Sequence, residues 1–285
     1  MTQPKYKPSG ALKSFVNAGK KPSRVLTSVE RHVLSTPRDA DRRSDLLHPS
    51  AMVSSSWCHR ASYFHLLGYE PAPRPIGLNQ HMIFAEGHRI HKVWQDVFED
   101  MGTLYGLWEM KDTGLTYWGF AADHEGPKRY REVPLDNEEL MITGHADGWL
   151  VGFGEPLLLE VKSIGIGSMR YYSPGLVKAD SDFANAWKNI TTPFESHISQ
   201  VQLYLKLLEL SDHESTPQEA VIIYESKVNQ EVKEFVVRKD SWGINHLIDA
   251  AKMIVEAVKT KTTPDCNNGG RLLCQGCKGY KDEQK

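Results

Sequence analysis

The sequence predicts a mixed α/β fold in which helices pack on a central β-sheet. Three long segments have the pattern of helices, at about 80–101, 195–210 and 240–259. Between them lie short runs rich in β-branched and aromatic residues, bounded by glycine and proline, as is typical of strands. At 285 residues the chain is long enough to bury a sizeable core.

The composition is that of an ordinary globular protein, with 40% hydrophobic and 25% charged residues. No apolar run reaches the roughly 18 residues of a membrane span. The first residues lack the apolar segment of a secretory signal. We therefore expect a cytoplasmic protein, in a bacterial, archaeal or phage-infected cell, with no membrane partner. Structural disulfides are rare in that compartment, so the four cysteines indicate metal ligation.

Residues 1–50 differ from the rest of the chain, because they carry ten Lys or Arg against four Asp or Glu and several prolines. Two interpretations are open. The segment is either a solvated, partly flexible leader or a basic arm that attracts a polyanion. We expect residues 51–285 to form a single domain.

The first element of that domain is a predicted helix over 54–68, which carries Cys58 and has serines at 54–56 as N-cap candidates. A proline-rich loop leads into the helix at about 80–101. Its apolar residues recur at helical spacing, at Ile90, Val93, Trp94, Val97 and Phe98. Short strands are expected next, at about 104–110, 115–121 and 129–133.

The centre of the chain predicts a hairpin, because two strand-like runs, 142–151 and 157–163, flank the turn GFGEP. A connection rich in glycine and aromatic residues follows at 165–195. After the helix at 195–210, two further strands are expected at 221–226 and 231–239, and the last helix leads into the cysteine tail.

Three charged residues fall inside this apolar hairpin. Strand periodicity places Glu160 and Lys162 on one face of their strand. A hairpin centred between Phe153 and Gly154 pairs Asp147 with Glu160. The sequence therefore predicts two carboxylates opposite each other with a lysine alongside.

Two adjacent carboxylates repel each other unless a cation lies between them. Oxygen ligands at this spacing suit Mg²⁺ or Mn²⁺, and Val161 contributes a backbone carbonyl. The alternative is a structural Glu–Lys ion pair with an aspartate that only forms the turn.

Two further patterns are weak by themselves. GHRIH places Gly87 four residues before His91, at the edge of an apolar helical face. QVQLY places Gln200 and Tyr204 on one face of the later helix. A lone histidine of this kind is usually a core residue, and helices contain many such i, i+4 pairs.

Together the four patterns are much more specific, and their order resembles the PD-(D/E)XK nuclease superfamily, in particular the RecB-type exonucleases. The motifs are GxxxH (87–91), GxxD (144–147), ExK (160–162) and QxxxY (200–204). The resemblance covers roughly residues 54–280. It implies a restriction-endonuclease-like core, with a central mixed β-sheet flanked by helices.

The resemblance also implies a role for each motif residue. One or two divalent metal ions would be held by His91, Asp147, Glu160 and the Val161 carbonyl. Lys162 would orient the attacking water and offset charge on the phosphorus. Gln200 and Tyr204 would support the site and touch the DNA backbone.

The tail CNNGGRLLCQGC holds three of the four cysteines. By itself the CxxC at 274–277 fits a redox pair or half of a zinc site. With Cys266 and the distant Cys58, the set resembles the iron–sulfur members of the same branch, the CRISPR-associated exonucleases and AddB-type nuclease domains. That resemblance implies a 4Fe–4S cluster held by a clasp of N- and C-terminal cysteines. In this chain the lone Cys266 precedes the CxxC pair, the reverse of the usual order, so zinc and unligated cysteines stay open as alternatives.

We therefore expect a metal-dependent DNA exonuclease acting on DNA ends or single strands, in recombination, repair, CRISPR adaptation or phage DNA metabolism. The sequence has no GxxxxGK[ST] motif, so unwinding would need a helicase partner; a recombinase or integrase partner is also compatible. The alternatives are a structure-specific or restriction-like endonuclease, and a non-catalytic DNA-binding assembly module.

The connection at 165–195 is a candidate DNA contact. Its aromatic side chains could stack on bases and its lysines could hold phosphates, at Tyr171, Tyr172, Trp187 and Lys188. The alternative is a surface loop that buries its own aromatic side chains.

Overall fold

The predicted hairpin is present in the computed structural model, in the predicted register. The strands β6 (Gly148–Leu150) and β7 (Leu157–Ile164) pair antiparallel, with Gly148 opposite Leu159 and Leu150 opposite Leu157. The same register, extended by one position, sets Asp147 against Glu160. A Cβ atom on Gly148 would lie 2.8 Å from a methyl carbon of the buried Leu104, so a larger residue here would disturb the packing of that side chain.

The structure describes residues 25–35, 43, 45–69, 76–176, 183–211, 216–240, 243–269 and 274–278. Backbone contacts divide the chain into two units, Met1–Asp41 with Arg74–Phe84 and Arg42–Pro73 with Ala85–Lys285. In the first unit, α2 (Leu26–Ser35) buries none of its residues. Most of the basic leader predicted over 1–50 lies outside the described residues. All the elements discussed below belong to the second unit, except the first turns of α5.

The central sheet is mixed, as predicted. Its strands follow the order β2-β1-β6-β7-β8-β9, and β3 pairs with β1. The β7–β8 pair is parallel, and the other pairs in this sheet are antiparallel. The remaining bounds are β1 (Leu104–Met110), β2 (Thr116–Phe120), β3 (Lys128–Tyr130), β8 (Glu219–Ser226) and β9 (Val232–Arg238). Two residues each from β4 (Val133–Pro134) and β5 (His145–Ala146) form a separate small sheet.

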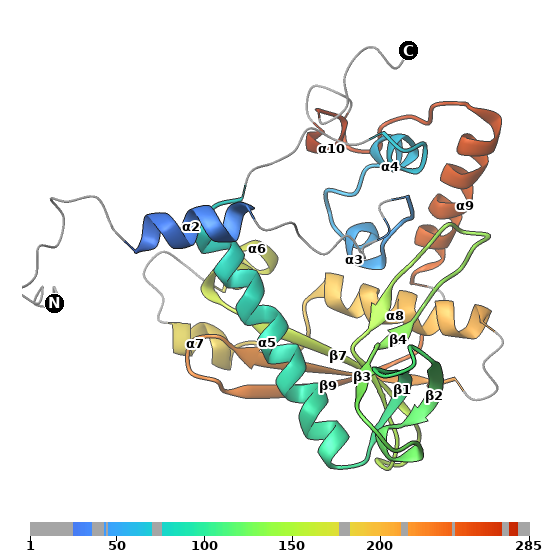
Figure 1. Cartoon of the computed structure of the whole chain (residues 1–285). Coiled ribbons are helices and arrows are strands. Elements are labelled where there is room, and N and C mark those ends of the chain that lie inside the picture. The colour runs from blue at the N-terminus through green and yellow to red at the C-terminus, as the bar shows by residue number, and fades with distance from the viewer. Residues whose placement is uncertain are drawn as a thin grey trace, which may run out of the picture. The chain divides into compact units, whose positions relative to one another are not determined.

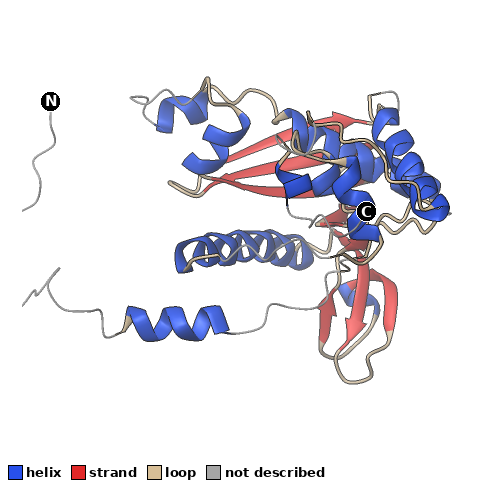
Figure 2. Cartoon of the chain, turned by 90° about the horizontal axis from the view of Figure 1, so that it is seen from above, coloured by secondary structure: helices blue, strands red, loops and turns tan. Residues whose placement is uncertain are grey.

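Helices cover both faces of the sheet, because β7 and β8 are apolar on both sides. On one face, α5 (Leu78–Asp100) packs through Ile90 and Phe98 against a cluster that includes Leu159, Val161, Val221 and Ile223. On the other face, α8 (Glu195–Leu210) packs on β7 and β8, in a buried cluster that includes Leu158, Ile164, Ile222 and Tyr224. Helix α9 (Asn245–Thr260) lies against α4 and contributes to the same cluster. Figure 1 labels these helices, and Figure 2 shows helices on both sides of the strands.

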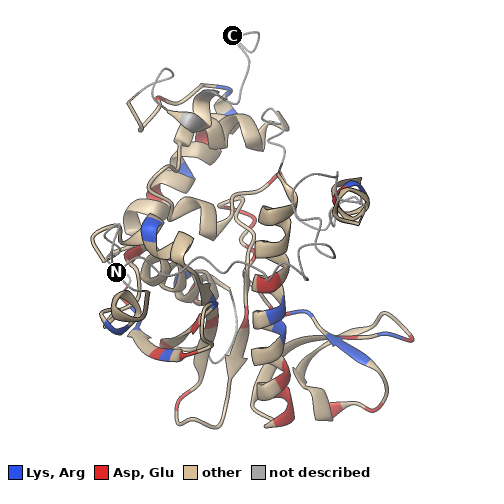
Figure 3. Ribbon diagram, turned by 90° about the vertical axis from the view of Figure 1, so that its left-hand side faces the viewer, with Lys and Arg blue, Asp and Glu red and all other residues tan. Residues whose placement is uncertain are grey.

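The outward side of α5 carries paired charges. Arg89 and Glu86 form an ion pair at 2.7 Å, and Lys92 pairs with Asp96 one turn further on. Figure 3 shows these acidic and basic residues interspersed along the helix. Exposed pairs of this kind contribute little to stability. They leave the opposite side of α5 to face the sheet.

Helix α8 is buried on nearly all sides, since nine of its sixteen residues are buried. Two of the nine are glutamines, Gln200 and Gln202. A buried amide needs internal hydrogen-bond partners, so each must be matched by polar groups of neighbouring elements.

Several predicted boundaries were wrong. The helix predicted over 54–68 begins only at His59, as α4 (His59–Leu66), and its N-cap is Cys58 rather than a serine. The Cys58 sulfur accepts the Ala61 N–H at 3.4 Å, which satisfies a free donor of the first helical turn. The run 142–151 is interrupted at Asp147, because β5 pairs with β4 while β6 pairs with β7.

The connection at 165–195 contains two short helices that the sequence did not predict, α6 (Ile166–Tyr172) and α7 (Phe183–Lys188). The remaining short elements are α3 (Pro49–Met52), η1 (Ala121–Asp123) and α10 (Gln275–Lys278). Within the described ranges, no helix has both the length and the apolar character needed to cross a bilayer.

Candidate functional site

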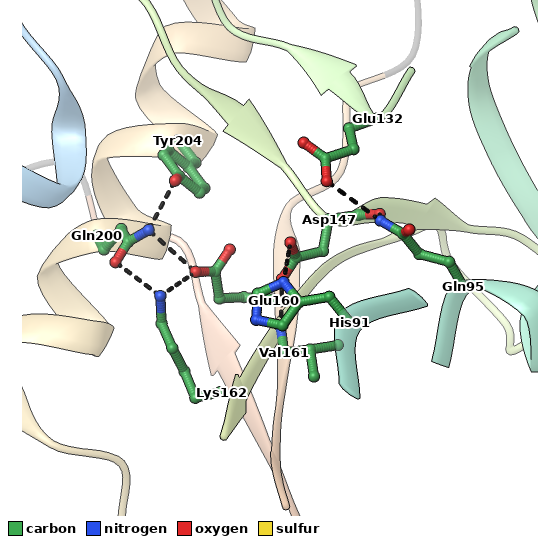
Figure 4. A network of polar contacts seen from close by, with 9 residues as sticks. All are labelled: His91, Gln95, Glu132, Asp147, Glu160, Val161, Lys162, Gln200 and Tyr204. Carbon is green, nitrogen blue, oxygen red and sulfur yellow. Dashed lines mark hydrogen bonds and ion pairs between the residues drawn. The ribbon is translucent and has the colours of Figure 1, made fainter. Parts of the chain in front are cut away.

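The fold brings six of the predicted motif residues into one polar network, drawn in Figure 4. Four separate elements supply them. His91 lies on α5, and Asp147 lies between β5 and β6. Strand β7 carries Glu160 and Lys162, and helix α8 carries Gln200 and Tyr204.

Asp147 is held from two sides. Its Oδ1 lies 2.9 Å from His91 Nδ1, and its Oδ2 accepts the Val161 N–H at 2.6 Å. Burial by itself would lower the pKa of His91, but the charge of Asp147 and the bond to it outweigh burial and raise that pKa. The interruption of the strand at Asp147 lets its side chain reach the backbone of β7.

Glu160, Lys162 and Gln200 form a closed triangle of polar contacts. The Lys162 ammonium pairs with Glu160 Oε1 and donates to Gln200 Oε1 at 3.1 Å. The Gln200 amide nitrogen donates to Glu160 Oε1 at 2.9 Å and to the Tyr204 hydroxyl at 2.6 Å. The i, i+4 spacing places the Tyr204 hydroxyl within hydrogen-bond distance of the Gln200 amide. Tyr204 thereby holds the amide group that contacts both Glu160 and Lys162.

Burial controls the ionisation of this triangle. Burial raises the pKa of Glu160 to about 7, against the opposing charge of Lys162. Burial would lower the pKa of Lys162, but the charges of Glu160 and Asp147 outweigh it and raise that pKa. Lys162 is therefore held as an ammonium at neutral pH, and the charge of Asp147 adds to the rise in the pKa of Glu160.

Glu132 and Gln95 also belong to this network, and sequence reasoning missed both. Gln95 Nε2 donates to Glu132 Oε1 at 3.3 Å and to the backbone carbonyl of Asp147 at 3.0 Å. Burial raises the pKa of Glu132 to about 7, and the charge of Asp147 adds to the effect. Gln95 follows His91 by four residues on α5, so helical spacing could have indicated it.

The donor set of the network fits a hard divalent cation. Two carboxylates, an imidazole and the Val161 carbonyl are ligand types that Mg²⁺ and Mn²⁺ accept. Neither Glu160 Oε2 nor His91 Nε2 has a hydrogen-bond partner in the described part of the chain. A cation here would also offset the burial and the charge of Asp147, which together raise the pKa of Glu160.

A cavity of about 900 Å³ opens beside Lys162 and Gln200. One wall comes from α6 and the start of α8, with Tyr171, Tyr172 and Phe194. Tyr172 stacks on Phe194 with ring centroids 5.2 Å apart, and Tyr171 is 62% exposed. The cavity is also lined by residues close to the cysteines in sequence, Trp57, His59, Asn267 and Asn268.

The structure corrects one predicted DNA contact. Trp187 is only 2% exposed, because its ring stacks on Phe183 and lies under the Lys233 ammonium, 5.4 Å from the ring centroid. It is a core residue of α7 and cannot stack on a base. Lys188 is exposed but does not line the cavity. Tyr171 and Tyr172 do line it.

The four cysteines form a second cluster, in which the sulfur atoms all lie within 4.8 Å of one another. Cys58 Sγ lies 3.8 Å from Cys266 Sγ and 3.4 Å from Cys277 Sγ. Such a set can bind a metal ion. The cysteine clasp between the two ends of the domain is therefore present. Among the described residues, no other group of three or more such donors is gathered this closely.

Side-chain and backbone contacts dock the tail onto the start of α4. Asn267 Oδ1 accepts the His59 N–H at 2.9 Å. Asn268 Nδ2 donates to the carbonyls of Trp57 and Ser56, at 2.7 and 3.0 Å. Both asparagines also line the cavity, and the Asn268 N–H donates to Cys266 Sγ, so the cysteine cluster adjoins the cavity lining.

Comparisons with known proteins give only distant likenesses. No family model matches the chain, and no curated protein matches it. The crystal structure of SSO0001 is 15% identical, with 86% of this chain and 87% of that chain covered, at a TM-score of 0.37. Two crystal structures of LHK-Exo are 9% identical over 77% of this chain. One, in complex with dAMP, is covered to 90% at a TM-score of 0.45. The other, described as an alkaline exonuclease from Laribacter hongkongensis, is covered to 91% at 0.43. Likenesses at this level do not assign the chain to a family.

Proposed function

We propose that this protein is a divalent-metal-dependent deoxyribonuclease that removes nucleotides from DNA ends or single strands. The observation that carries the proposal is the buried array of Asp147, Glu160 and Lys162, held by Gln200 at the edge of a large cavity. A purely structural Glu–Lys pair would not need a second carboxylate, a histidine and an open cavity beside it.

The residues that would hold the metal are His91, Asp147, Glu160 and the carbonyl of Val161. A bound Mg²⁺ or Mn²⁺ supplies positive charge to the phosphate oxygens and lowers the pKa of a bound water. Hydrolysis of an anionic phosphodiester needs both contributions, because the substrate is negatively charged and water is a weak nucleophile.

Lys162 has two tasks in this proposal. Its ammonium is fixed by Glu160 and Gln200, so it can hold a water molecule and offset the charge that develops on the phosphate. Gln200 is a positioning residue, since it orients Lys162 and Glu160. Tyr204 fixes Gln200 in turn.

The cavity gives the substrate a route to these groups. It is lined by Lys162, by the exposed ring of Tyr171, which can stack on a base, and by Asn267 and Asn268. An aromatic and amide lining is compatible with a single strand of DNA read without strong sequence preference.

The test is an assay on three labelled substrates with added Mg²⁺ or Mn²⁺: linear single-stranded DNA, linear duplex and circular single-stranded DNA. We expect both linear substrates to be shortened from their ends and the circle to stay intact. Cleavage of the circle would favour an endonuclease. No cleavage of any substrate, with DNA binding unaffected by Lys162→Met, would favour a non-catalytic DNA-binding module.

A further inference from the structure

We propose that Cys58, Cys266, Cys274 and Cys277 hold one tetrahedral zinc ion rather than a 4Fe–4S cluster. The proposal does not depend on the nuclease function proposed above. It rests on the spacing of the sulfur atoms, on the packing around them and on the backbone groups that face them.

The first argument is the distance between the sulfur atoms. Four thiolates that share one zinc ion at a bond length of about 2.3 Å lie at the corners of a tetrahedron with edges of about 3.8 Å. In this structure Cys58 Sγ lies 3.8 and 3.4 Å from two of its partners, and the whole set lies within 4.8 Å. The observed spacing therefore matches that of ligands around a single ion.

A 4Fe–4S cluster makes a different demand. Each cysteine binds a different iron of the cluster, so the body of the cluster separates the four sulfur atoms. Their separation must then exceed that of four ligands on one ion. Here the sulfur atoms leave no such space, and all four would have to move outward to admit a cluster.

The packing around the cysteines opposes that movement. Gly276 lies between Cys274 and Cys277, and a Cβ atom there would lie 3.1 Å from Cys58 Cβ and 3.2 Å from Ala61 Cβ. The tail therefore lies directly against the start of α4. A side chain at position 276 would push the tail away from α4, so the glycine favours a small ligand sphere.

Three backbone N–H groups point at the sulfur atoms. The donors are Ala61 to Cys58 at 3.4 Å, Asn268 to Cys266 at 3.4 Å and Cys277 to Cys274 at 3.5 Å. Hydrogen bonds of this kind stabilise thiolates and orient metal ligands. These contacts therefore favour ligated thiolates at Cys58, Cys266 and Cys274.

The reversed order of the tail cysteines agrees with this assignment. Asn267 and Asn268 follow Cys266 directly and fasten it to the carbonyls of Trp57 and Ser56. Cys266 thus lies next to Cys58. The other two ligands, Cys274 and Cys277, come from the segment that contains α10. The zinc ion would fix Asn267 and Asn268 in the cavity wall.

The test begins with the full-length chain purified anaerobically from cells grown with added iron. Metal and acid-labile sulfide are then measured. We expect about one zinc per chain, no sulfide and no visible absorption, and we expect no brown chromophore after incubation with iron and sulfide. Replacement by Co²⁺ should give the visible bands of a tetrahedral thiolate site. Iron and sulfide in a ratio of about four each per chain would overturn the proposal, and so would four free thiols in the presence of zinc.

Two variants locate the ion. Cys266→Ser should lose the zinc and the cobalt spectrum, and Asp147→Asn should keep both, because Asp147 belongs to the other site. A zinc ion retained in Cys266→Ser but lost in Asp147→Asn would contradict the assignment. Since both readouts are spectroscopic or analytical, they are independent of whether the protein cleaves DNA.

Discussion

Replacing Gln200 with alanine tests the polar network most sharply. The amide of Gln200 makes three hydrogen bonds, with Glu160, Lys162 and Tyr204. Alanine would remove the Gln200 partner of the buried Tyr204 hydroxyl, while Glu160 Oε1 would keep its ion pair with Lys162. A buried group left unsatisfied costs about 1–3 kcal/mol. We therefore expect the free energy of unfolding to fall by about 1–3 kcal/mol.

The same substitution should also slow cleavage, for a separate reason. Without Gln200, the Lys162 ammonium keeps its ion pair with Glu160 but loses the contact that fixes its direction. Misplacement of a catalytic group by about 1 Å can cost about 100-fold in rate. We expect a loss of about this size in the cleavage rate of the folded variant.

Gln202 provides a matched control on the same helix. It is also buried, and its amide donates to the Arg238 carbonyl and accepts the Asp240 N–H, both at 2.6 Å. Gln202→Ala should therefore cost similar stability. It should leave the cleavage rate per folded molecule unchanged, because neither partner of Gln202 belongs to the candidate site.

The assay pairs urea unfolding, followed by tryptophan fluorescence, with cleavage of end-labelled single-stranded DNA at a temperature where both variants stay folded. The reasoning is refuted if Gln200→Ala cleaves at the wild-type rate. It is equally refuted if Gln202→Ala is slowed as much, since the loss would then follow stability and not the position of Lys162.

Three further outcomes are expected. Lys162→Met should reduce cleavage by about 10²–10³-fold or more, while DNA binding in a fluorescence polarisation assay changes little; equal losses of binding and cleavage would contradict its role. Burial raises the pKa of Glu132 from 4.5 to about 7, so the folded protein keeps this proton after the unfolded chain has released it. Without added Mg²⁺ or Mn²⁺, the free energy of unfolding should thus fall by about 1–3 kcal/mol as the pH rises through this range. Glu132→Gln should reduce that slope in urea titrations at pH 5 and 8, and an unchanged slope would count against it. Tyr171→Ala should weaken single-strand binding by about 1–3 kcal/mol, whereas Trp187→Ala should lower stability by about 3–5 kcal/mol; the reverse pattern would show that the assignment of the two aromatics is wrong.

The sequence predicted the parts of the site that depend on local periodicity. The glycines and proline of GFGEP define the centre of the turn, so the register of Asp147 against Glu160 follows from counting. Gln200 and Tyr204 share a helical face because of their spacing, and the hydrogen bond between them has that origin.

The remaining parts depend on packing between distant segments, which periodicity does not reveal. Glu132 reaches the network from a left-handed backbone conformation, with φ of 63°, and through a partner on α5. Trp187 was assigned to a DNA contact because it lies among aromatic and basic residues, yet α7 turns it inward onto Phe183. The N-cap of α4 was assigned to serines, the usual residues there. A cysteine holds that position because its sulfur also faces the other three cysteines.

The central claim is that Asp147, Glu160 and Lys162 form a metal-dependent nuclease site, and one measurement tests it most directly. The release of nucleotides from end-labelled linear single-stranded DNA is followed with Mn²⁺, with and without excess chelator, for the wild type and for Asp147→Asn. The account predicts release by the wild type with Mn²⁺, and no release with chelator or by the variant. Release by Asp147→Asn at the wild-type rate, or a wild type that stays inert with both Mg²⁺ and Mn²⁺, would contradict it.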